Sequence, residues 1–154
     1  MRLARIIVTF FYIGYAKIAP GSVASLVTTL IFYLFAKHLI YYLFIIIILI
    51  TTIFALLAVS VYTYKSLEKD RSEIVIDEVI GQSIALLPLL IFEQTNPPQL
   101  FMCVISLLFF RFFDIVKPFP INNFDKMNNT FGVIFDDILA GIFSALFLIL
   151  ALSF

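Results

Sequence analysis

Long apolar runs alternate with short polar breaks along this chain. The two clearest runs cover residues 40–64 and 132–154, and shorter ones cover 22–36, 79–92 and 100–113. A helix that spans a membrane needs about 20 predominantly apolar residues, with a range of about 17–25. The pattern therefore predicts an all-α, polytopic membrane protein with about five membrane-embedded helices.

An N-terminal hydrophobic segment, residues 3–16, precedes these helices. It is only marginally long enough to cross a bilayer, so it either spans, lies in the interface or re-enters the membrane. Its basic residues Arg2 and Arg5 fit the start of a signal peptide loosely, but the cleavage cue is poor and further apolar runs follow at once. We expect the segment to be retained and residues 1–154 to form a single membrane-embedded domain.

Charge and proline mark the breaks between the runs. Residues 65–73 form a charged loop, and residues 93–98 form a turn with two prolines. The segment Lys117-Pro-Phe-Pro120 ends the helix before it, because proline lacks the backbone N–H and disfavours the helical conformation of its predecessor.

Composition excludes most other classes of protein. Hydrophobic residues make up 63% and charged residues 13% of the 154 residues, whereas soluble domains average about 45–50% and about 25%. A domain of this size cannot bury such an excess. The net charge is zero, which gives no indication of a nucleic-acid partner.

Positive charge orients the predicted helices. If they begin at Ser22, Ile40, Val79, Leu100 and Gly132, nine of the ten basic residues fall on one side and only Lys37 falls on the other. Because basic residues concentrate in cytoplasmic loops, the first side is expected to be cytoplasmic. The loops at 37–39 and 93–98 and the C-terminus then face outward.

Five of the ten carboxylates adjoin or enter the predicted helices, and all five fall at cytoplasmic ends. They are Asp77, Glu78, Asp114, Asp136 and Asp137. A charge inside a membrane costs about 2.5–3.5 kcal/mol on insertion scales, so these groups need a reason to be there. The other carboxylates considered, those of the charged loop and Glu93, are interpreted as ordinary solvated charges.

Close carboxylates repel one another by about 4 kcal/mol at 4 Å and an effective dielectric constant of about 20. Mg²⁺ prefers oxygen ligands of this kind. Arg111 and Lys117 each lie three residues from Asp114 on the same helix face and are the available basic partners. Spacing alone therefore leaves three explanations open: a metal site, a network of ion pairs without metal, and an ion or proton pathway.

Small residues continue the faces on which the carboxylates lie. Asp77, Gly81 and Ala85 share one face, and two further seams are Asp136–Ala140–Ser144 and Asp137–Gly141–Ala145. Seams of this kind allow helices to approach closely in lipid. We therefore expect the carboxylates to point into the bundle.

The segment Ala19-Pro-Gly-Ser22 opens the helix that carries Ser25. Free backbone N–H groups and the positive end of the helix dipole suit a phosphate at such a position. Helix capping by Ser22 explains the same residues equally well.

Taken in order, three segments resemble the motifs of the phosphatidylglycerophosphatase A family. They are D-E-x-x-G at 77–81, R-x-x-D-x-x-K-P-x-P at 111–120 and D-D-x-x-A-G at 136–141, and 20–25 is similar to the family's P-G-[ST]-x-x-S element. The departures are Asn129-Thr130, where a glycine pair is common in the family, and Ala24, where glycine is common. No acidic motif position is lost.

The resemblance implies an integral inner-membrane, Mg²⁺-dependent lipid phosphatase with its active site at the cytoplasmic face. Its substrate would be phosphatidylglycerophosphate, and its products phosphatidylglycerol and inorganic phosphate. The implied metal-binding and catalytic residues are Asp77, Glu78, Asp114, Asp136 and Asp137, and those that bind the substrate phosphate are Arg111, Lys117, Gly21, Ser22 and Ser25.

Two alternatives from other classes remain. One is a small cation or proton transporter whose carboxylates line the pathway, and the other is a non-catalytic assembly subunit that uses its acidic residues in ion pairs. The outer halves of the predicted helices are almost wholly apolar, which weighs against a pathway through the bilayer.

Overall fold

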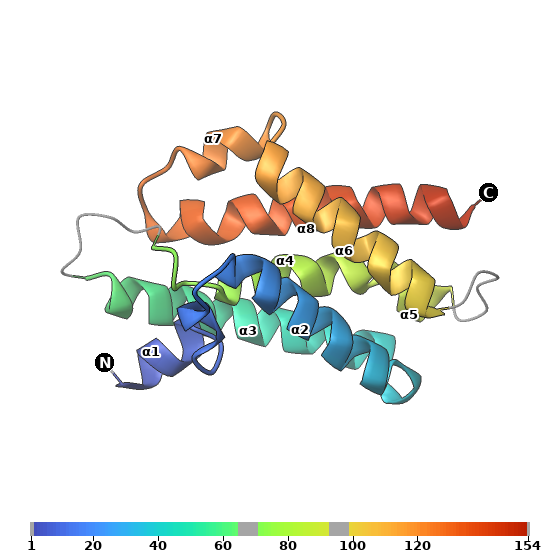
Figure 1. Ribbon diagram of the computed structural model, residues 1–154, viewed down its shortest axis with the longest axis horizontal. Helices are drawn as coiled ribbons and strands as arrows, with labels where there is room; N and C mark the ends of the chain where they lie inside the picture. Colours follow the sequence, from blue (N-terminus) through green and yellow to red (C-terminus); the bar gives the residue numbers. More distant parts are fainter. Residues whose placement is uncertain (1, 65–70, 93–98, 154) are drawn as a thin grey trace.

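The computed structural model describes residues 2–64, 71–92 and 99–153. Most of the predicted charged loop and all of the predicted proline-containing turn lie outside the described residues. The described part is helical and contains no strand, so the all-α prediction is confirmed (Figure 1).

The helices follow one another in an elongated bundle, with two short 3-10 turns between them. The α-helices are α1 (Arg2–Val8), α2 (Pro20–Phe35), α3 (Tyr41–Tyr62), α4 (Ile76–Leu86), α5 (Pro88–Ile91), α6 (Gln99–Val116), α7 (Ile121–Asp125) and α8 (Thr130–Leu152), and the 3-10 turns are η1 (Ile13–Tyr15) and η2 (Ala36–His38).

Four segments of the described chain are long and apolar enough to cross a membrane. They are Pro20–His38, Tyr41–Tyr62, Gln99–Val116 and Thr130–Leu152, that is α2 with η2, α3, α6 and α8. The prediction of a polytopic helical membrane protein is confirmed at this level. The expected count of about five is not.

The expected helix over residues 79–92 consists of two shorter helices, α4 and α5. The backbone N–H of Leu87 donates to the carbonyl of Ile84, a bond of the tighter 3-10 kind, and α5 starts at Pro88. Proline cannot donate the next helical hydrogen bond, so the helix is interrupted here. Neither piece alone is long enough to span.

The N-terminal segment folds back instead of spanning as one helix. The seven residues of α1 extend only about 10 Å, against a hydrocarbon core of about 30 Å. Beyond α1 the chain turns through three residues with positive φ, beginning at Phe10. The backbone N–H of Val75 donates to the carbonyl of Val8 at 2.9 Å, and Gly14 packs directly against the backbone of Glu73. The segment thus supports the stretch that leads into α4.

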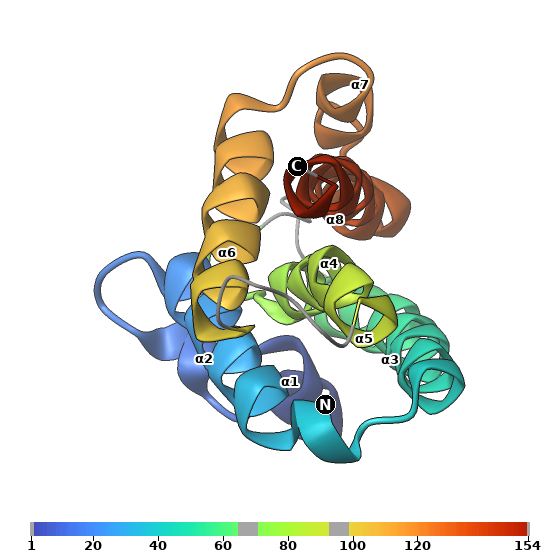
Figure 2. The ribbon, with the colours of Figure 1, turned by 90° about the vertical axis from the view of Figure 1, so that its right-hand side faces the viewer.

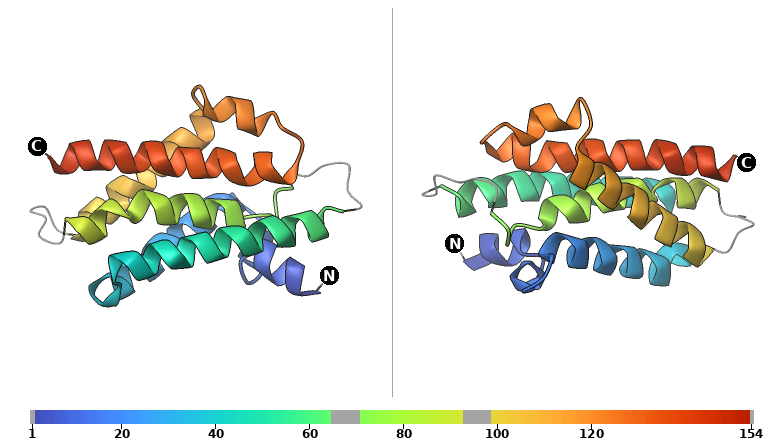
Figure 3. Two further views of the ribbon diagram at one scale, coloured as in Figure 1. Left: turned by 180° about the vertical axis from the view of Figure 1, so that it is seen from behind. Right: turned by 45° about the horizontal axis from the view of Figure 1, so that its top comes forward.

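Helix α4 occupies the centre of the bundle, with α2, α3, α6 and α8 around it (Figure 2). The views in Figure 3 show α3, α4 and α8 running side by side. Gly81 and Gly141 pack so closely that a Cβ on Gly141 would collide with the carbonyl of Gly81. The close approach expected from the small-residue seams is therefore observed between α4 and α8.

Large apolar side chains cover the outside of the bundle. On α3, Ile46, Leu49, Ile53 and Leu57 are all at least half exposed. Water would disfavour such a surface, whereas lipid does not, because its acyl chains are equally apolar. This outward face is that of a membrane protein.

Candidate active site

One end of the bundle gathers all five carboxylates that the sequence singled out. Asp77 and Glu78 lie in the first turn of α4, and Asp136 and Asp137 lie near the start of α8. Helix α6 brings Asp114 there with its C-terminal end. All five line one cavity of about 280 Å³.

Asp77, Glu78 and Asp137 form the acidic cluster of this cavity. Each offers one carboxylate oxygen, and these oxygens lie within 4.8 Å of one another. Within the described chain, none of the three forms an ion pair with a basic residue. Three unpaired carboxylates at this distance repel strongly when ionised. Their oxygens are suitable ligands for a hard divalent cation such as Mg²⁺.

The other two carboxylates are neutralised by basic neighbours. The Nη1 of Arg111 lies 2.6 Å from Oδ2 of Asp114, one turn away on α6. The Nζ of Lys117 lies 2.7 Å from Oδ2 of Asp136 and also pairs with Asp125. The structure therefore divides the five acids into a cluster of three and two ion-paired groups.

Lys117 joins the loop after α6 to α7 and α8. Partial burial by itself lowers the pKa of this amine, but the hydrogen bonds and charges of Asp125 and Asp136 outweigh that effect and raise the pKa above its ordinary value. Lys117 is therefore a permanent positive charge at the cavity wall at neutral pH.

The N-terminus of α2 forms the opposite wall. Pro20 is the first residue of the helix and Ala19 precedes it in a left-handed conformation, so the chain turns sharply into the cavity. Gly21 and Ser22 line the cavity. A Cβ on Gly21 would collide with the carboxylate of Glu78, so only glycine allows α2 and Glu78 to approach this closely.

Ser25 lies one turn further along α2 and does not line the cavity. It is fully buried, and its hydroxyl donates to the carbonyl of Gly21 at 2.9 Å. The structure thus brings Gly21 and Ser22 to the cavity and places Ser25 behind them.

Arg71 lines the same cavity, although it was not among the site residues expected from the sequence. Its Nη2 lies 2.6 Å from Oε1 of Glu73, and its guanidinium stands 5.5 Å from the centre of the Tyr62 ring. The hydroxyl of Tyr62 donates to Glu73 at 3.2 Å. Within a run of alternating charges, only the proximity of Arg71 to the first acidic motif could have indicated this position.

The start of α8 is held by its own cap. The side chain of Asn129 accepts a hydrogen bond from the backbone N–H of Gly132 at 2.8 Å, which satisfies one of the free N–H groups of the first turn. Gly132 packs against the carbonyls of Phe124 and Met127. Asn129, which departs from the family pattern, therefore caps the helix that carries Asp136 and Asp137.

The ionisable groups that line the cavity carry an excess of negative charge. Five carboxylates face three basic side chains, those of Arg71, Arg111 and Lys117. When all are ionised, the excess equals two charges, which one divalent cation balances. The residues present therefore fit a divalent metal site beside a group of cations suited to phosphate.

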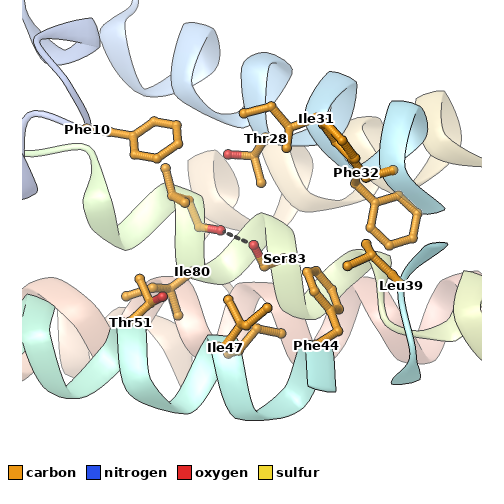
Figure 4. A pocket seen from close by; sticks show the side chains of 13 residues that line it. Phe10, Thr28, Ile31, Phe32, Leu39, Phe44, Ile47, Thr51, Ile80 and Ser83 are labelled. Atoms are coloured by element: carbon orange, nitrogen blue, oxygen red, sulfur yellow. Dashed lines mark hydrogen bonds between the residues drawn. The ribbon is translucent and has the colours of Figure 1, made fainter. Parts of the chain in front are cut away.

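A second cavity, of about 310 Å³, lies between α2, α3 and α4 and is mainly apolar. Figure 4 shows the side chains of Ile80 and Ile47 facing those of Ile31 and Phe32 across it. Its hydroxyl groups include Ser83, which donates to the carbonyl of Val79. No acidic or basic side chain lines this cavity.

Comparisons with known proteins agree with the motifs. A protein of Bacteroides thetaiotaomicron, provisionally named a phosphatidylinositol-3-phosphatase, is 29% identical over 153 residues, which covers 94% of this chain and 89% of the relative. The phosphatidylglycerophosphatase A of Haemophilus influenzae is 41% identical over 78 residues, or 50% of this chain and 44% of the relative. That of Escherichia coli is 31% identical over 138 residues, or 86% and 73%.

No solved structure matches the chain significantly. The family model for phosphatidylglycerophosphatase A, in contrast, matches residues 6–152. That range contains the acidic cluster, the basic side chains around it and the N-terminus of α2. The chain therefore belongs to the phosphatidylglycerophosphatase A family and is a membrane phosphatase.

Proposed function

We propose that this protein hydrolyses phosphatidylglycerophosphate to phosphatidylglycerol and inorganic phosphate and that it uses Mg²⁺. The observation that carries the proposal is the acidic cluster of Asp77, Glu78 and Asp137, which lacks basic partners in the described chain and lies beside cationic side chains. The reason to propose a lipid phosphate as the substrate is that the chain belongs to this family.

The acidic cluster would hold the metal ion. Bound there, Mg²⁺ supplies a Lewis acid that polarises a phosphoryl oxygen and lowers the pKa of a bound water. The three carboxylates come from two helices, and the close packing of Gly81 on Gly141 sets the distance between them. Rigid positioning of this kind is what a metal site needs from its first ligands.

The remaining groups would bind and orient the phosphate. Arg71, Arg111 and Lys117 would neutralise its charge. Gly21 and Ser22 line the cavity in the first turn of α2, where backbone N–H groups and the positive end of the helix dipole would favour the phosphate. A water oxygen attacks phosphorus, the bond from phosphorus to the glycerol oxygen breaks, and that oxygen takes up a proton from water and leaves as the alcohol. Asp114 and Asp136 are the two carboxylates outside the cluster that are available to accept the water proton.

We place the active site at the cytoplasmic face of a bacterial inner membrane. Helix α1, which carries Arg2 and Arg5, lies at the same end of the bundle as the start of α8, whereas the turn that follows α2 and contains Lys37 lies at the other end (Figure 1). The positive-inside rule then puts the cavity on the cytoplasmic side. There the carboxylates lie at the level of lipid headgroups.

Two other functions compete with this one. The provisional name of the Bacteroides relative makes a phosphoinositide a second candidate substrate. A small cation or proton transporter would require polar groups along the whole bilayer. The carboxylates instead gather at one end, and the cavity deeper between α2, α3 and α4 lacks charged groups, so the geometry favours an enzyme.

The decisive experiment is phosphate release by the purified protein in detergent micelles. We expect release from phosphatidylglycerophosphate with Mg²⁺, none with EDTA, and slower release from phosphatidylinositol 3-phosphate. Faster release from the phosphoinositide would move the substrate assignment to that lipid. If folded protein releases no phosphate but conducts cations in liposomes, the phosphatase proposal is wrong and the transporter becomes the better explanation.

A further inference from the structure

Gln82 on α4 is a fully buried amide that lacks a partner. Its side chain has no solvent exposure, and neither its Oε1 nor its Nε2 has a hydrogen-bond partner among the described residues. Leaving a buried amide unpaired destabilises a protein, and native structures rarely tolerate it unless a water or ion completes the bonding. The position of Gln82 suggests what completes it here.

Gln82 follows Asp77 and Glu78 along α4, in the middle of the helix. It follows Gly81, which packs against the backbone of Asp137 and the ring of Phe110. It is also one helical turn from Glu78, and side chains at this spacing are neighbours, with about 5–6 Å between their Cβ atoms.

Glu78 has the complementary vacancy in its hydrogen bonding. Its Oε1 lies against Gly21, whereas its Oε2 is buried and has no hydrogen-bond partner in the described chain. An ionised carboxylate only accepts hydrogen bonds, and the Nε2 of an amide only donates them. A donor and an acceptor that both lack partners therefore occur on consecutive turns of one helix.

We infer that Gln82 is a positioning residue of the acidic cluster: its Nε2–H holds the Glu78 carboxylate, directly or through one water, when the cluster binds a divalent cation. Carboxylates that bind metals are typically oriented by hydrogen bonds of this kind. Gln82 acts through Glu78 and touches neither the lipid nor the phosphate. The inference rests on the proposed function because it requires a cation in the cluster.

The test compares Gln82→Met with wild type in detergent by two measurements. The first is Mn²⁺ affinity by electron paramagnetic resonance, and the second is the thermal unfolding midpoint in EDTA. Methionine has nearly the length of glutamine but forms no comparable hydrogen bond, so we expect Mn²⁺ to bind roughly 10–100-fold more weakly. The midpoint in EDTA should stay equal or rise, because an unpaired amide has been removed.

Ser106→Ala is the matched control. Ser106 on α6 is also fully buried, and its hydroxyl also lacks a partner among the described residues, but it lies two helical turns from Asp114. We expect its removal to leave Mn²⁺ affinity unchanged. Wild-type affinity in Gln82→Met, or an equal loss in Ser106→Ala, would overturn the inference while leaving the proposed function intact. Wild-type protein that neither binds Mn²⁺ nor releases phosphate would overturn both.

Gln82→Glu provides a second test that does not depend on the folding of the methionine variant. A carboxylate at this position adds a buried charge beside the cluster, so the unfolding midpoint in EDTA should fall. If the side chain faces the cluster, Mn²⁺ should raise that midpoint by more than it does in wild type. A low midpoint that Mn²⁺ fails to raise would mean that residue 82 faces away, and would contradict the inference.

Discussion

Helix α4 borders two cavities of similar size and opposite chemistry. Asp77 and Glu78, in the first turn of α4, line the acidic cavity of about 280 Å³. Val79 and Ser83, on another face of the same helix, line the apolar cavity of about 310 Å³. Successive side chains of an α-helix point about 100° apart, so adjacent residues of α4 can line different cavities.

The two cavities differ in how their polar groups are satisfied. In the apolar cavity the hydroxyls of Thr28 and Ser83 donate to carbonyls of their own helices, at 2.8 and 2.7 Å. In the acidic cavity three carboxylates lie close together, and Oε2 of Glu78 has no partner in the described chain. These two hydroxyls therefore need no ligand, whereas the acidic cavity carries an electrostatic cost that a cation would relieve.

Removing one charge of the acidic cluster should affect activity more than any other single change. Asp137→Asn removes a proposed metal ligand, so the proposed Mg²⁺-dependent phosphate release should fall by at least about 100-fold, more than the loss of an outer hydrogen bond typically costs. The thermal unfolding midpoint in EDTA should rise at the same time, because repulsion within the cluster decreases. Turnover at the wild-type rate would exclude Asp137 as a ligand.

A second prediction concerns the helix contact behind the cluster. A Cβ on Gly141 would collide with the backbone of Gly81, which cannot move without shifting α4, so Gly141→Ala should cost about 1–3 kcal/mol of stability. Phosphate release should fall as well, because the separation of Asp77 and Asp137 changes. Reversible unfolding in detergent measures the first effect, with Ile142→Leu on the exposed face of α8 as control. Equal stability of the two variants would contradict the close contact.

Gly21→Ala should separate activity from stability. Here the added Cβ would meet the carboxylate of Glu78, a side chain that can rotate away, so we expect little change in the unfolding midpoint. Displacing Glu78 should lower phosphate release about tenfold and raise the Mg²⁺ concentration needed for half-maximal release. A loss of stability as large as that of Gly141→Ala, without a change in Mg²⁺ dependence, would show that Gly21 only packs.

The smallest effect is expected in the apolar cavity. The hydroxyl of Ser83 bonds within its own helix, so Ser83→Ala should change stability by less than about 0.5 kcal/mol and leave phosphate release unchanged. Assays of Ser83→Ala beside Asp137→Asn compare the two faces of α4 directly. A marked loss of release in Ser83→Ala would mean that the apolar cavity also takes part in the reaction.

Much of the site could be predicted because its signals are local. Charges that interrupt long apolar runs are conspicuous, so Asp77, Asp114 and Asp137 could be selected from their positions alone. The spacing of Gly81 and Gly141 from these acids indicated close helix packing in the same way. Both signals depend only on residue type and helical period.

Other parts of the site depend on contacts between distant segments. Arg71 lies in a charged run that resembles any solvated loop, and only its ion pair with Glu73 beside the ring of Tyr62 places it at the cavity. Gln82 is one polar residue within an apolar helix, and its lack of a partner is visible only when all its neighbours are known. That the N-terminal segment folds back against the stretch leading into α4 could be seen only from its contact with Val75.

Apolar runs and the positions of the charged residues were enough to predict a helical membrane protein in which five carboxylates meet at one end of the bundle, because the cost of burying charge in lipid leaves few other positions for them. The division of these acids into a cluster and two ion-paired groups became visible only in the folded chain. Asp114 and Asp136 have basic partners, and the other three do not. That division depends on distances of a few ångströms between helices, which the contact of Gly81 with Gly141 and the approach of α2 at Gly21 establish.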